Sequence, residues 1–357
     1  MNNIGLFGPF DLSRRDGNTI RILMQARGLM ENGFSNVTVF AYGTCDKTPV
    51  PQRRVGDRLF PKKFPFRQKL PRLGVDLVHA HHYHGAMLVR EPVIVDMPSF
   101  TTLQTNAMYQ HVGTAFKRFA MRRVFNPLVQ TPIEAGIIRN ARHVIAASEN
   151  IRRHILETIP GVATPITVVT NTIDPRAYEP AQHSGLRVGL SSSNFTDTID
   201  LGCLDFAMQV ADRLPDVEFL IAGPMSAEQG AALAARPNMK PLGLLGFNDY
   251  RTFMQSISVF LMPYGFYDYG GSKFKLLEAG ACGLAVASTT GGAIGFEPED
   301  VLLIEDEPEA LAERISALRD PALRREHGMA LRREIEARHD YLKESLKLIE
   351  IYGKALS

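Results

Sequence analysis

The stretch SVFLMPYGFYDYGGSKFKLLEAGACGLAVAST, residues 258–289, joins two short apolar runs through a glycine-rich turn and a helical pattern. Each apolar run has the length of a strand that is buried on both faces, about five residues. Between the runs, apolar residues recur at helical spacing up to Gly283, and glycine is common just after a helix. The order strand, helix, strand is typical of a parallel βαβ unit.

The same alternation runs along the 357 residues in two series. The first series comprises the runs NIGLFG, NVTVFAY, DLVHAH, PVIVDM and HVIAAS, and the second comprises LRVGLSS, VEFLIAG, SVFLMPY and LAVAST. A chain of this length favours two domains, and the stretch 175–185, rich in proline, glycine and polar residues, is the natural linker. We therefore expect an α/β fold of two doubly wound, Rossmann-like domains that face a central cleft, at residues 1–178 and 179–339.

Composition excludes several classes of protein. Hydrophobic residues make up 45% and charged residues 22% of the chain, as in ordinary globular proteins. The three cysteines, Cys45, Cys203 and Cys282, lie far apart and form no CxxC pair, so we expect neither a disulfide framework nor a structural zinc site. The N-terminus has no signal-peptide pattern and no apolar run is long enough to span a membrane. We expect a cytoplasmic location.

The net charge of +2 hides an asymmetry between the two halves of the chain. Residues 1–180 contain 23 Lys and Arg against 13 Asp and Glu, whereas residues 181–357 contain 17 against 25. Two basic stretches with interleaved bulky apolar residues, Arg53–Arg72 and Lys117–Arg123, predict peripheral contact with the inner face of an anionic membrane. A solvated face beside core residues explains the same pattern equally well. Nucleic acid is not an expected partner, because prolines interrupt any recognition helix.

Ligands of doubly wound folds bind at the carboxyl ends of strands, beside helix N-termini. The first such loop, GPFDLSRRDGNTIR, contains neither GxGxxG nor GxxxxGK[ST], which argues against NAD and ATP as ligands. Gly17 and Asn18, at the start of the first helix, are nevertheless candidates for close backbone approach to a ligand.

The stretch DLVHAHHYHG contains four histidines. In a strand, His79 and His81 would share one face. No cysteine or nearby carboxylate completes a metal site, so we expect no metal here. We interpret His79 as a buried core residue, and His81 as a catalytic residue at the cleft edge that hydrogen-bonds a substrate hydroxyl.

The turn before the helix of the opening stretch has the features of an anion site. Ser272 is a suitable N-cap, and Gly270 and Gly271 expose backbone N–H groups beside a helix terminus that carries a partial charge of about +0.5. Lys275 and Glu278 lie three residues apart on one helix face. We expect phosphate at the N–H groups and the sugar hydroxyls of a nucleotide at Glu278. A solvent-exposed ion pair between Lys275 and Glu278 is the alternative.

Residues 263–292 resemble the donor-binding segment of retaining family-4 glycosyltransferases of the GT-B fold, whose pattern contains K-L-L-E-A, a small residue, a glycine and an apolar strand. Other stretches resemble the family in the same order along the chain. They are DGNTIRILMQARGLMENG for the first glycine loop and helix, DLVHAH and HVIAASEN for two strands, VVTNTID for the usual N-G-V-D hinge, and VEFLIAGP for a strand of the C-terminal domain. The resemblance covers nearly the whole chain.

The resemblance implies metal-independent transfer of a sugar from a nucleoside-diphosphate sugar to an acceptor hydroxyl, with retention and with no cofactor besides the donor substrate. Glu278 would bind the ribose, Gly271 and Ser272 would offer N–H groups to the diphosphate or the donor sugar, and Gly17 would approach from the other domain. Lys275 would stabilise the leaving diphosphate. The basic N-terminal patches suit a lipid-linked or membrane-surface glycan as acceptor. The C-terminal helix, about 340–357, would cross back to the N-terminal domain.

The chain departs from the family pattern at three places. Gly270 stands where many members have an acidic residue that contacts the donor sugar. The basic pair that usually holds the diphosphate is absent after the first strand of the C-terminal domain, where we expect Ser192 and Asn194 to contact the donor instead. Lys273, as a donor-binding residue, or Lys275 could substitute for the missing basic pair. The histidine usual after the strand VIVDM is absent too. Two alternatives therefore stay open: a catalytically degenerate partner that binds nucleotide sugars, and a GT-B epimerase.

Overall fold

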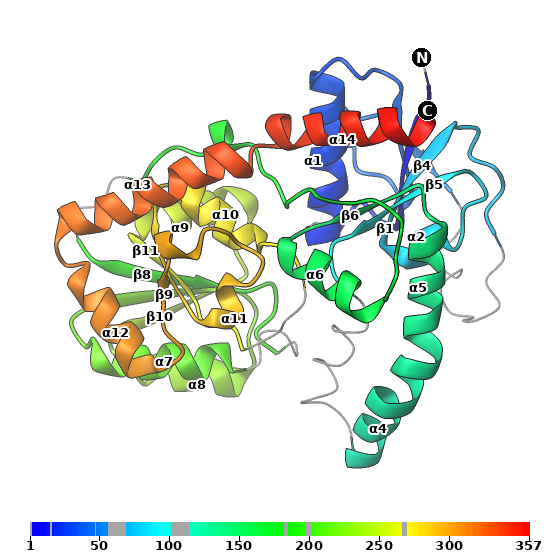
Figure 1. Cartoon of the computed structure of the whole chain (residues 1–357). Helices are drawn as coiled ribbons and strands as arrows, with labels where there is room; N and C mark the ends of the chain where they lie inside the picture. The colour runs from blue at the N-terminus through cyan, green and yellow to red at the C-terminus, as the bar shows by residue number, and fades with distance from the viewer. Residues whose placement is uncertain are drawn as a thin grey trace.

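The structure is a computed structural model that describes residues 2–14, 16–46, 48–55, 69–100, 114–181, 185–196, 202–265 and 270–357, apart from the side chain of Phe247. Most of the basic stretch Arg53–Arg72 lies outside the described residues. Two parallel sheets lie side by side, and helices cover their faces (Figure 1). This arrangement confirms the expected α/β fold of two doubly wound units.

The N-terminal sheet has seven strands in the order β3-β2-β1-β4-β5-β6-β7, and every pairing is parallel. Its strands are β1 (Ile4–Asp11), β2 (Val37–Gly43), β3 (Gln52–Arg54), β4 (Leu77–His81), β5 (Val93–Met97), β6 (His143–Ala146) and β7 (Ile166–Val168). Its helices are α1 (Gly17–Glu31), α2 (His82–Ala86), α4 (Ala115–Phe119), the π-helical η2 (Ala120–Gln130), α5 (Thr131–Asn140) and α6 (Glu149–Thr158).

The C-terminal sheet has six strands in the order β10-β9-β8-β11-β12-β13, again paired in parallel. Its strands are β8 (Arg187–Ser191), β9 (Glu218–Ala222), β10 (Met239–Gly243), β11 (Val259–Met262), β12 (Ala285–Ser288) and β13 (Leu303–Ile304). Its helices are α7 (Cys203–Arg213), α8 (Ala227–Ala234), α9 (Phe247–Ser256), α10 (Phe274–Ala281), α11 (Thr290–Ala293), α12 (Pro308–Ala317) and α13 (Pro321–Arg338). The strand order switches direction between β8 and β11, and the crevice at such a point is where open α/β sheets bind ligands.

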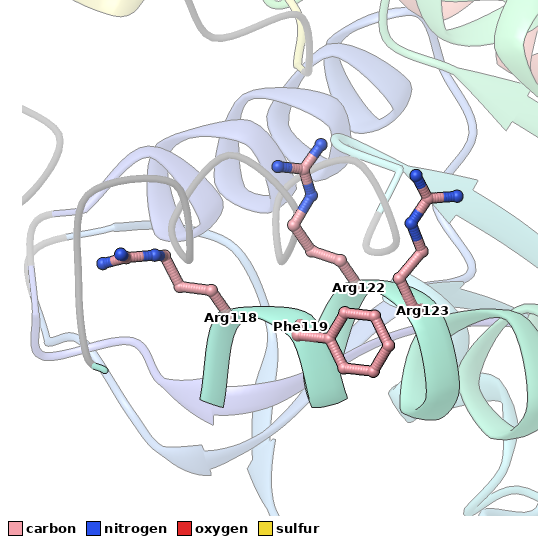
Figure 2. A pocket seen from close by; sticks show the side chains of 4 residues that line it. All are labelled: Arg118, Phe119, Arg122 and Arg123. Carbon is pink, nitrogen blue, oxygen red and sulfur yellow. The ribbon is translucent and has the colours of Figure 1, made fainter. Parts of the chain in front are cut away.

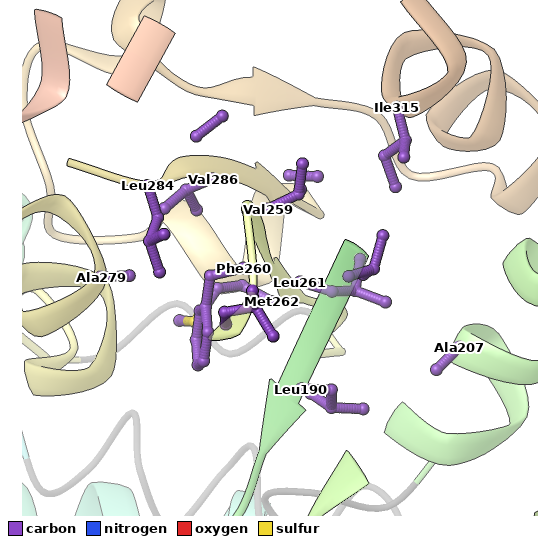
Figure 3. Packing of buried hydrophobic residues seen from close by; sticks show 14 of the residues in the cluster. Leu190, Ala207, Val259, Phe260, Leu261, Met262, Ala279, Leu284, Val286 and Ile315 are labelled. Carbon is purple, nitrogen blue, oxygen red and sulfur yellow. The ribbon is translucent and has the colours of Figure 1, made fainter. Parts of the chain in front are cut away.

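The opening stretch forms the predicted βαβ unit, with α10 between β11 and β12. Phe260, Leu261 and Leu277 are fully buried in a core shared by strands and helices, part of which Figure 3 shows. Helix α10 ends at Ala281, and Gly283 follows with a φ of +68°, a conformation that favours glycine. Helix α10 is therefore fixed by its buried face, which holds its N-terminus at the edge of the sheet.

The last helix, α14 (Tyr341–Leu356), lies across α1 of the N-terminal unit (Figure 1). The two helices approach closely at Gly28, where a Cβ atom would lie 2.6 Å from the carbonyl oxygen of Tyr341. The hydroxyl of Tyr352 lies 2.7 Å from Nδ1 of the buried His79. The chain thus passes twice between the units, and Ile173 and Asp340 pair where the two crossings run side by side.

Helices α4, η2 and α5 form a long helical arm, residues 115–140, that extends from the N-terminal unit (Figure 1). Phe116 is 80% exposed and Phe119 is 61% exposed on this arm, and Leu128 is exposed as well. Among the helices described, none combines the length and the apolarity that a membrane crossing requires.

Candidate functional site

The loops that follow the strands of both sheets meet at a seam between the two units. Gly17, at the start of α1, faces the ring of Phe274, at the start of α10; a Cβ atom on Gly17 would lie 3.4 Å from that ring. Pro98 follows β5 and Ser148 follows β6, and both contact the turn 270–272 before α10. The loop that leads from β1 into Gly17 and the start of α10 therefore lie together. Both were predicted from the sequence as ligand-binding places.

The turn 270–272, which we call the glycine loop, is hydrogen-bonded to the N-terminal unit. The N–H of Gly271 donates to the carbonyl of Pro98 at 3.2 Å, and the hydroxyl of Ser148 donates to the carbonyl of Gly270 at 3.1 Å. A Cβ atom on Gly271 would lie 2.8 Å from Cβ of Ala147, so only glycine fits there without a shift. The expectation that Gly271 offers an open N–H is thus wrong for this arrangement, because a carbonyl already accepts that proton.

Ser272 does not have the role expected for it at the start of α10. The N-cap is Lys273, which makes no side-chain cap hydrogen bond, and the helix begins one residue later than predicted. Ser272 is completely buried, and its hydroxyl has no hydrogen-bond partner among the described residues. Buried hydroxyls normally have a partner, so this one is a candidate contact for a ligand at the helix N-terminus.

Both lysines at the start of α10 contact carbonyl groups of the C-terminal unit. Nζ of Lys273 donates to the carbonyl of Gly291 at 2.7 Å, and Nζ of Lys275 donates to the carbonyl of Ser191, at the end of β8, at 3.1 Å. The loop after β8 is shaped by Ser192, whose hydroxyl accepts the N–H of Asn194 at 2.9 Å. Lys275 therefore places a positive charge beside the loop that lacks the basic pair of the family pattern.

Glu278 lies on the wall of a cavity of about 110 Å³ between α9, α10 and residues 177–179. The hydroxyl of Tyr178 donates to Oε1 of Glu278 at 3.2 Å, and that of Tyr250 donates to Oε2 at 3.5 Å. Burial raises the pKa of Glu278, and the two hydroxyls together with the charge of Lys275 lower it in part. This half-buried carboxylate is not on the solvated helix face that the ion-pair alternative requires.

The histidines of β4 belong to a buried polar cluster. His79 and His81 stack with ring centroids 5.2 Å apart, which confirms that they share a face, and both are fully buried. The carboxylate of Asp96, on the neighbouring strand β5, lies 3.3 Å from Nε2 of His79 and 3.7 Å from Nε2 of His81. The prediction that no carboxylate lies near His79 and His81 is therefore wrong, because the pairing of β4 with β5 brings Asp96 beside them.

The carboxylate of Asp96 in this cluster is nevertheless already paired with a cation of the protein, the guanidinium of Arg21. Arg21 donates to both carboxylate oxygens of Asp96 at 2.8 Å, and Nε2 of Gln25 donates to Oδ2 at 2.9 Å. Burial alone would raise the pKa of Asp96, but the charge of Arg21 and the two histidines hold it well below its ordinary value. A metal ion bound by His79, His81 and Asp96 would have to replace or face the guanidinium, so these residues do not fit a metal site.

His81 lies deeper than expected, and the next residue, His82, is half-buried. His81 has no accessible surface, its Nε2 lies 3.1 Å from Oε1 of Gln25, and burial lowers its pKa well below the ordinary value. It therefore does not stand at the cleft edge, and its catalytic role stays a prediction. His82 has a φ of +58°, rare for a residue with a side chain, and its Nε2 lies 3.1 Å from Oδ1 of Asn18. Burial lowers the pKa of His82 to about 4, so the ring is neutral near pH 7.

Two protein-family models match the chain, one in each of the two units. A family model described as Glycosyltransferase Family 4 matches residues 16–177, and one described as Glycosyl transferases group 1 matches residues 188–320. The chain belongs to this glycosyltransferase family. No curated protein sequence matches this glycosyltransferase in a search of such sequences.

Solved structures confirm the fold of this glycosyltransferase. It is similar to sucrose-phosphate synthase from Thermosynechococcus elongatus, with 16% identity, a TM-score of 0.72 and 99% of each chain covered. It is also similar to Anabaena HepE, solved in complex with UDP and glucose, with 13% identity, a TM-score of 0.67 and 99% and 100% of the chains covered. WaaG, a glycosyltransferase involved in lipopolysaccharide biosynthesis, has 14% identity, a TM-score of 0.60 and 98% and 99% covered. At these identities the likeness establishes the fold, which is GT-B.

Several residues at the seam of this glycosyltransferase were not predicted from the sequence. Ser148, Asn171, Tyr178, Tyr250 and His82 each contact a predicted site residue. Three of them lie in stretches quoted above, namely Ser148 in HVIAASEN, Asn171 in VVTNTID and His82 in DLVHAHHYHG. The contacts themselves depend on tertiary placement that no local pattern encodes.

Proposed function

We propose that this glycosyltransferase binds a nucleoside-diphosphate sugar at the start of α10 and transfers the sugar to an acceptor hydroxyl with retention, without a metal ion. The observation that carries the proposal is the completely buried Ser272, whose hydroxyl has no partner among the described residues, at a helix N-terminus on the seam between the two units. A helix N-terminus favours an anion because its N–H groups and dipole are positive.

The chemistry would depend on charge that develops on the leaving diphosphate. Lys275 and the first N–H groups of α10 are fixed in place before the reaction, and such preorganised donors stabilise charge with little reorganisation. Because the glycine loop is closed against the N-terminal unit, water would have limited access to the donor. His82 and Asn18, which contact each other at the start of α1, are the groups of the N-terminal unit that we propose to meet an acceptor hydroxyl.

Glu278 would accept hydrogen bonds from the ribose hydroxyls of the nucleotide. Its carboxylate is already held by the hydroxyls of Tyr178 and Tyr250, so ribose hydroxyls would add to or replace these two donors. The structures of Anabaena HepE with UDP and with UDP-glucose support a uridine nucleotide as the first donor to test.

The proposal is tested by calorimetric titration of UDP-, GDP-, TDP- and ADP-sugars into the wild-type protein and two variants. Hydrogen bonds to a charged group contribute about 1.5–3 kcal/mol, so Glu278→Ala should weaken binding of the preferred donor by about ten- to a hundredfold. The control is Glu309→Ala, which removes an exposed carboxylate of α12 and should leave binding unchanged. If no nucleotide sugar binds the wild-type protein, the proposal is wrong.

The main alternative is a member of the family that binds donors without turnover. Gly270 has a φ of +113°, a region that residues with side chains rarely adopt, so this backbone disfavours the acidic residue that many members have there. Tight donor binding with no release of nucleoside diphosphate in the presence of lipid-linked glycan extracts would favour this alternative. Product formation without any acceptor would favour an epimerase.

For the acceptor, we propose a lipid-linked or membrane-surface glycan, reached through the helical arm. Arg118, Phe119, Arg122 and Arg123 line a hollow of about 290 Å³ on the arm, and Figure 2 shows Arg122 and Arg123 rising from the same side of the helix. Exposed aromatic rings beside guanidinium groups are the combination that an anionic membrane surface attracts. Failure of the wild-type protein to sediment with anionic vesicles at low salt would remove the membrane from the proposal.

A further inference from the structure

The glycine loop is connected to the N-terminal unit at three successive residues. Besides the bonds of Gly270 to Ser148 and of Gly271 to Pro98, Nδ2 of Asn171 donates to the carbonyl of Ser272 at 2.8 Å. The Asn171 bond is buried, whereas the Ser148 bond is half-buried, and the Asn171 bond ends at the residue directly before the N-cap of α10. Of the three links, the Asn171 amide therefore constrains the start of α10 most directly.

The orientation of the Asn171 amide is fixed by a second contact. Nη1 of Arg21 donates to Oδ1 of Asn171 at 2.9 Å. A guanidinium has donors only, so the oxygen of the amide must face Arg21 and the nitrogen must face the Ser272 carbonyl. Arg21 is itself held by both oxygens of Asp96 and is almost completely buried. A continuous chain of charge-assisted and neutral hydrogen bonds thus leads from β5 through Arg21 and Asn171 to the glycine loop.

Asn171 also lies where the chain crosses between the units. Its backbone carbonyl lies 2.8 Å from Nδ1 of His339, on the return crossing, and two residues later Ile173 pairs with Asp340. Any rotation of one unit against the other must bend these two crossings. The Asn171 side chain is therefore at the hinge, while its amide nitrogen reaches the loop that the hinge would move.

We propose that Asn171 is a positioning residue that clamps the glycine loop onto the N-terminal unit, so that the closed arrangement of the two units and the placement of the donor depend on its amide. The part that concerns the donor rests on the proposed function, whereas the part that concerns closure does not. Arg21 acts through Asn171 by fixing which end of the amide faces the loop.

Replacement of Asn171 by aspartate and by alanine separates this role from a role in fold stability. Aspartate keeps the shape and the contact with Arg21, but it places an acceptor against the Ser272 carbonyl. Alanine removes both contacts without adding repulsion. If Asn171 only stabilised the fold through Arg21, Asn171→Asp would be the milder change, because aspartate keeps that contact. If Asn171 clamps the glycine loop through Ser272, Asn171→Asp is the more severe change, because aspartate repels that carbonyl.

The experiment measures small-angle X-ray scattering of the ligand-free proteins and calorimetric binding of the nucleotide sugar that the panel above selects. We expect a larger radius of gyration and about tenfold weaker donor binding for Asn171→Asp, with smaller changes for Asn171→Ala. The matched control is Asn238→Asp, because Nδ2 of Asn238 also donates to carbonyls, those of Ala211 and Leu214, but wholly within the C-terminal unit. This control should leave both quantities as in the wild-type protein.

The outcomes distinguish the clamp from the donor site. If the wild-type protein binds no nucleotide sugar, the proposed function fails, and the scattering comparison still tests the clamp. A radius of gyration and donor affinity of Asn171→Asp equal to those of Asn238→Asp, or tighter donor binding, overturns the inference. Should Asn171→Asp not fold, Asn171→Ala decides in its place, because it removes the link to Ser272 without adding repulsion: a radius of gyration equal to that of the wild-type protein overturns the inference.

Discussion

Replacement of Glu278 by glutamine should stabilise the protein and weaken donor binding at the same time. The carboxylate is half-buried, and burial is the largest cause that raises its pKa above the ordinary value of 4.5. Between the ordinary value and the raised one, the native chain holds more protons at this group than the unfolded chain, so stability falls as the pH rises through that window. Glutamine has the same shape, carries no charge and can pair with the hydroxyls of Tyr178 and Tyr250, because each hydroxyl can accept as well as donate.

The magnitude for the donor follows from the contacts that Glu278 offers. Its two oxygens can accept two ribose hydroxyls, whereas glutamine offers one oxygen and no charge. Loss of a hydrogen bond to a charged group costs about 1.5–3 kcal/mol, which corresponds to about ten- to a hundredfold weaker binding. The same argument predicts that donor binding by the wild-type protein weakens when the pH falls toward the raised pKa of Glu278.

Thermal unfolding at pH 8 and at pH 5, together with donor titration at pH 8, checks both parts. Glu278→Gln should melt at a higher temperature than the wild type at pH 8, and the difference should shrink at pH 5, where Glu278 is closer to protonation. The control Glu313→Gln, at an exposed carboxylate in the middle of α12, should change neither property. A lower melting temperature for Glu278→Gln at pH 8 would show that the carboxylate stabilises the fold, and unchanged donor affinity would show that it does not contact the ribose.

Three further variants test separate parts of the structure. Gly271→Ala places a Cβ atom 2.8 Å from Cβ of Ala147, and we expect an overpacking cost of about 1–3 kcal/mol at the seam, seen as a larger radius of gyration in solution scattering; an unchanged radius would contradict the close contact. Tyr352→Phe leaves Nδ1 of the buried His79 without its partner and should lower the free energy of unfolding in urea by about 1–3 kcal/mol, whereas no change would mean that the pair contributes little. Phe119→Asp, at a ring that is 61% exposed, should reduce sedimentation with anionic vesicles without changing the melting temperature, and full retention of vesicle binding would exclude this ring from the membrane contact.

The sequence predicts the parts of this protein that depend on local pattern. Short apolar runs separated by helical patterns identify the parallel sheets, and Gly283 marks the end of α10 because its backbone conformation is one that glycine favours. The start of the same helix is predicted one residue early. Ser272 has the chemistry of an N-cap, but its carbonyl is held by Asn171 and its hydroxyl is turned into the interior. Tertiary contacts across the seam thus override a local preference.

The sequence pattern does not predict the buried polar cluster around Asp96, and the reason is a different one. Charged residues are mostly exposed in proteins, so a helix that contains Arg21 is expected to turn it to solvent. Its burial becomes understandable only when Asp96 is seen beside it, and Asp96 comes from a strand that follows 75 residues later in the sequence. His82, the first residue of α2 directly after β4, likewise adopts a positive φ that the sequence pattern does not predict.

Position 270 connects one departure from the family pattern with the contact between the two units. Many members have an acidic side chain there, directed at the donor sugar; here glycine adopts a φ of +113° and its carbonyl accepts the hydroxyl of Ser148 from the other unit. The same backbone conformation that disfavours a side chain also allows the glycine loop to lie against the N-terminal unit, where Gly271 and Ser272 are bonded as well. Position 270 thus offers no side chain to a donor sugar, and its backbone carbonyl instead contacts the other unit. If the chain is catalytic, recognition of the donor sugar must come from residues other than Gly270, such as Ser272, whose buried hydroxyl has no partner among the described residues.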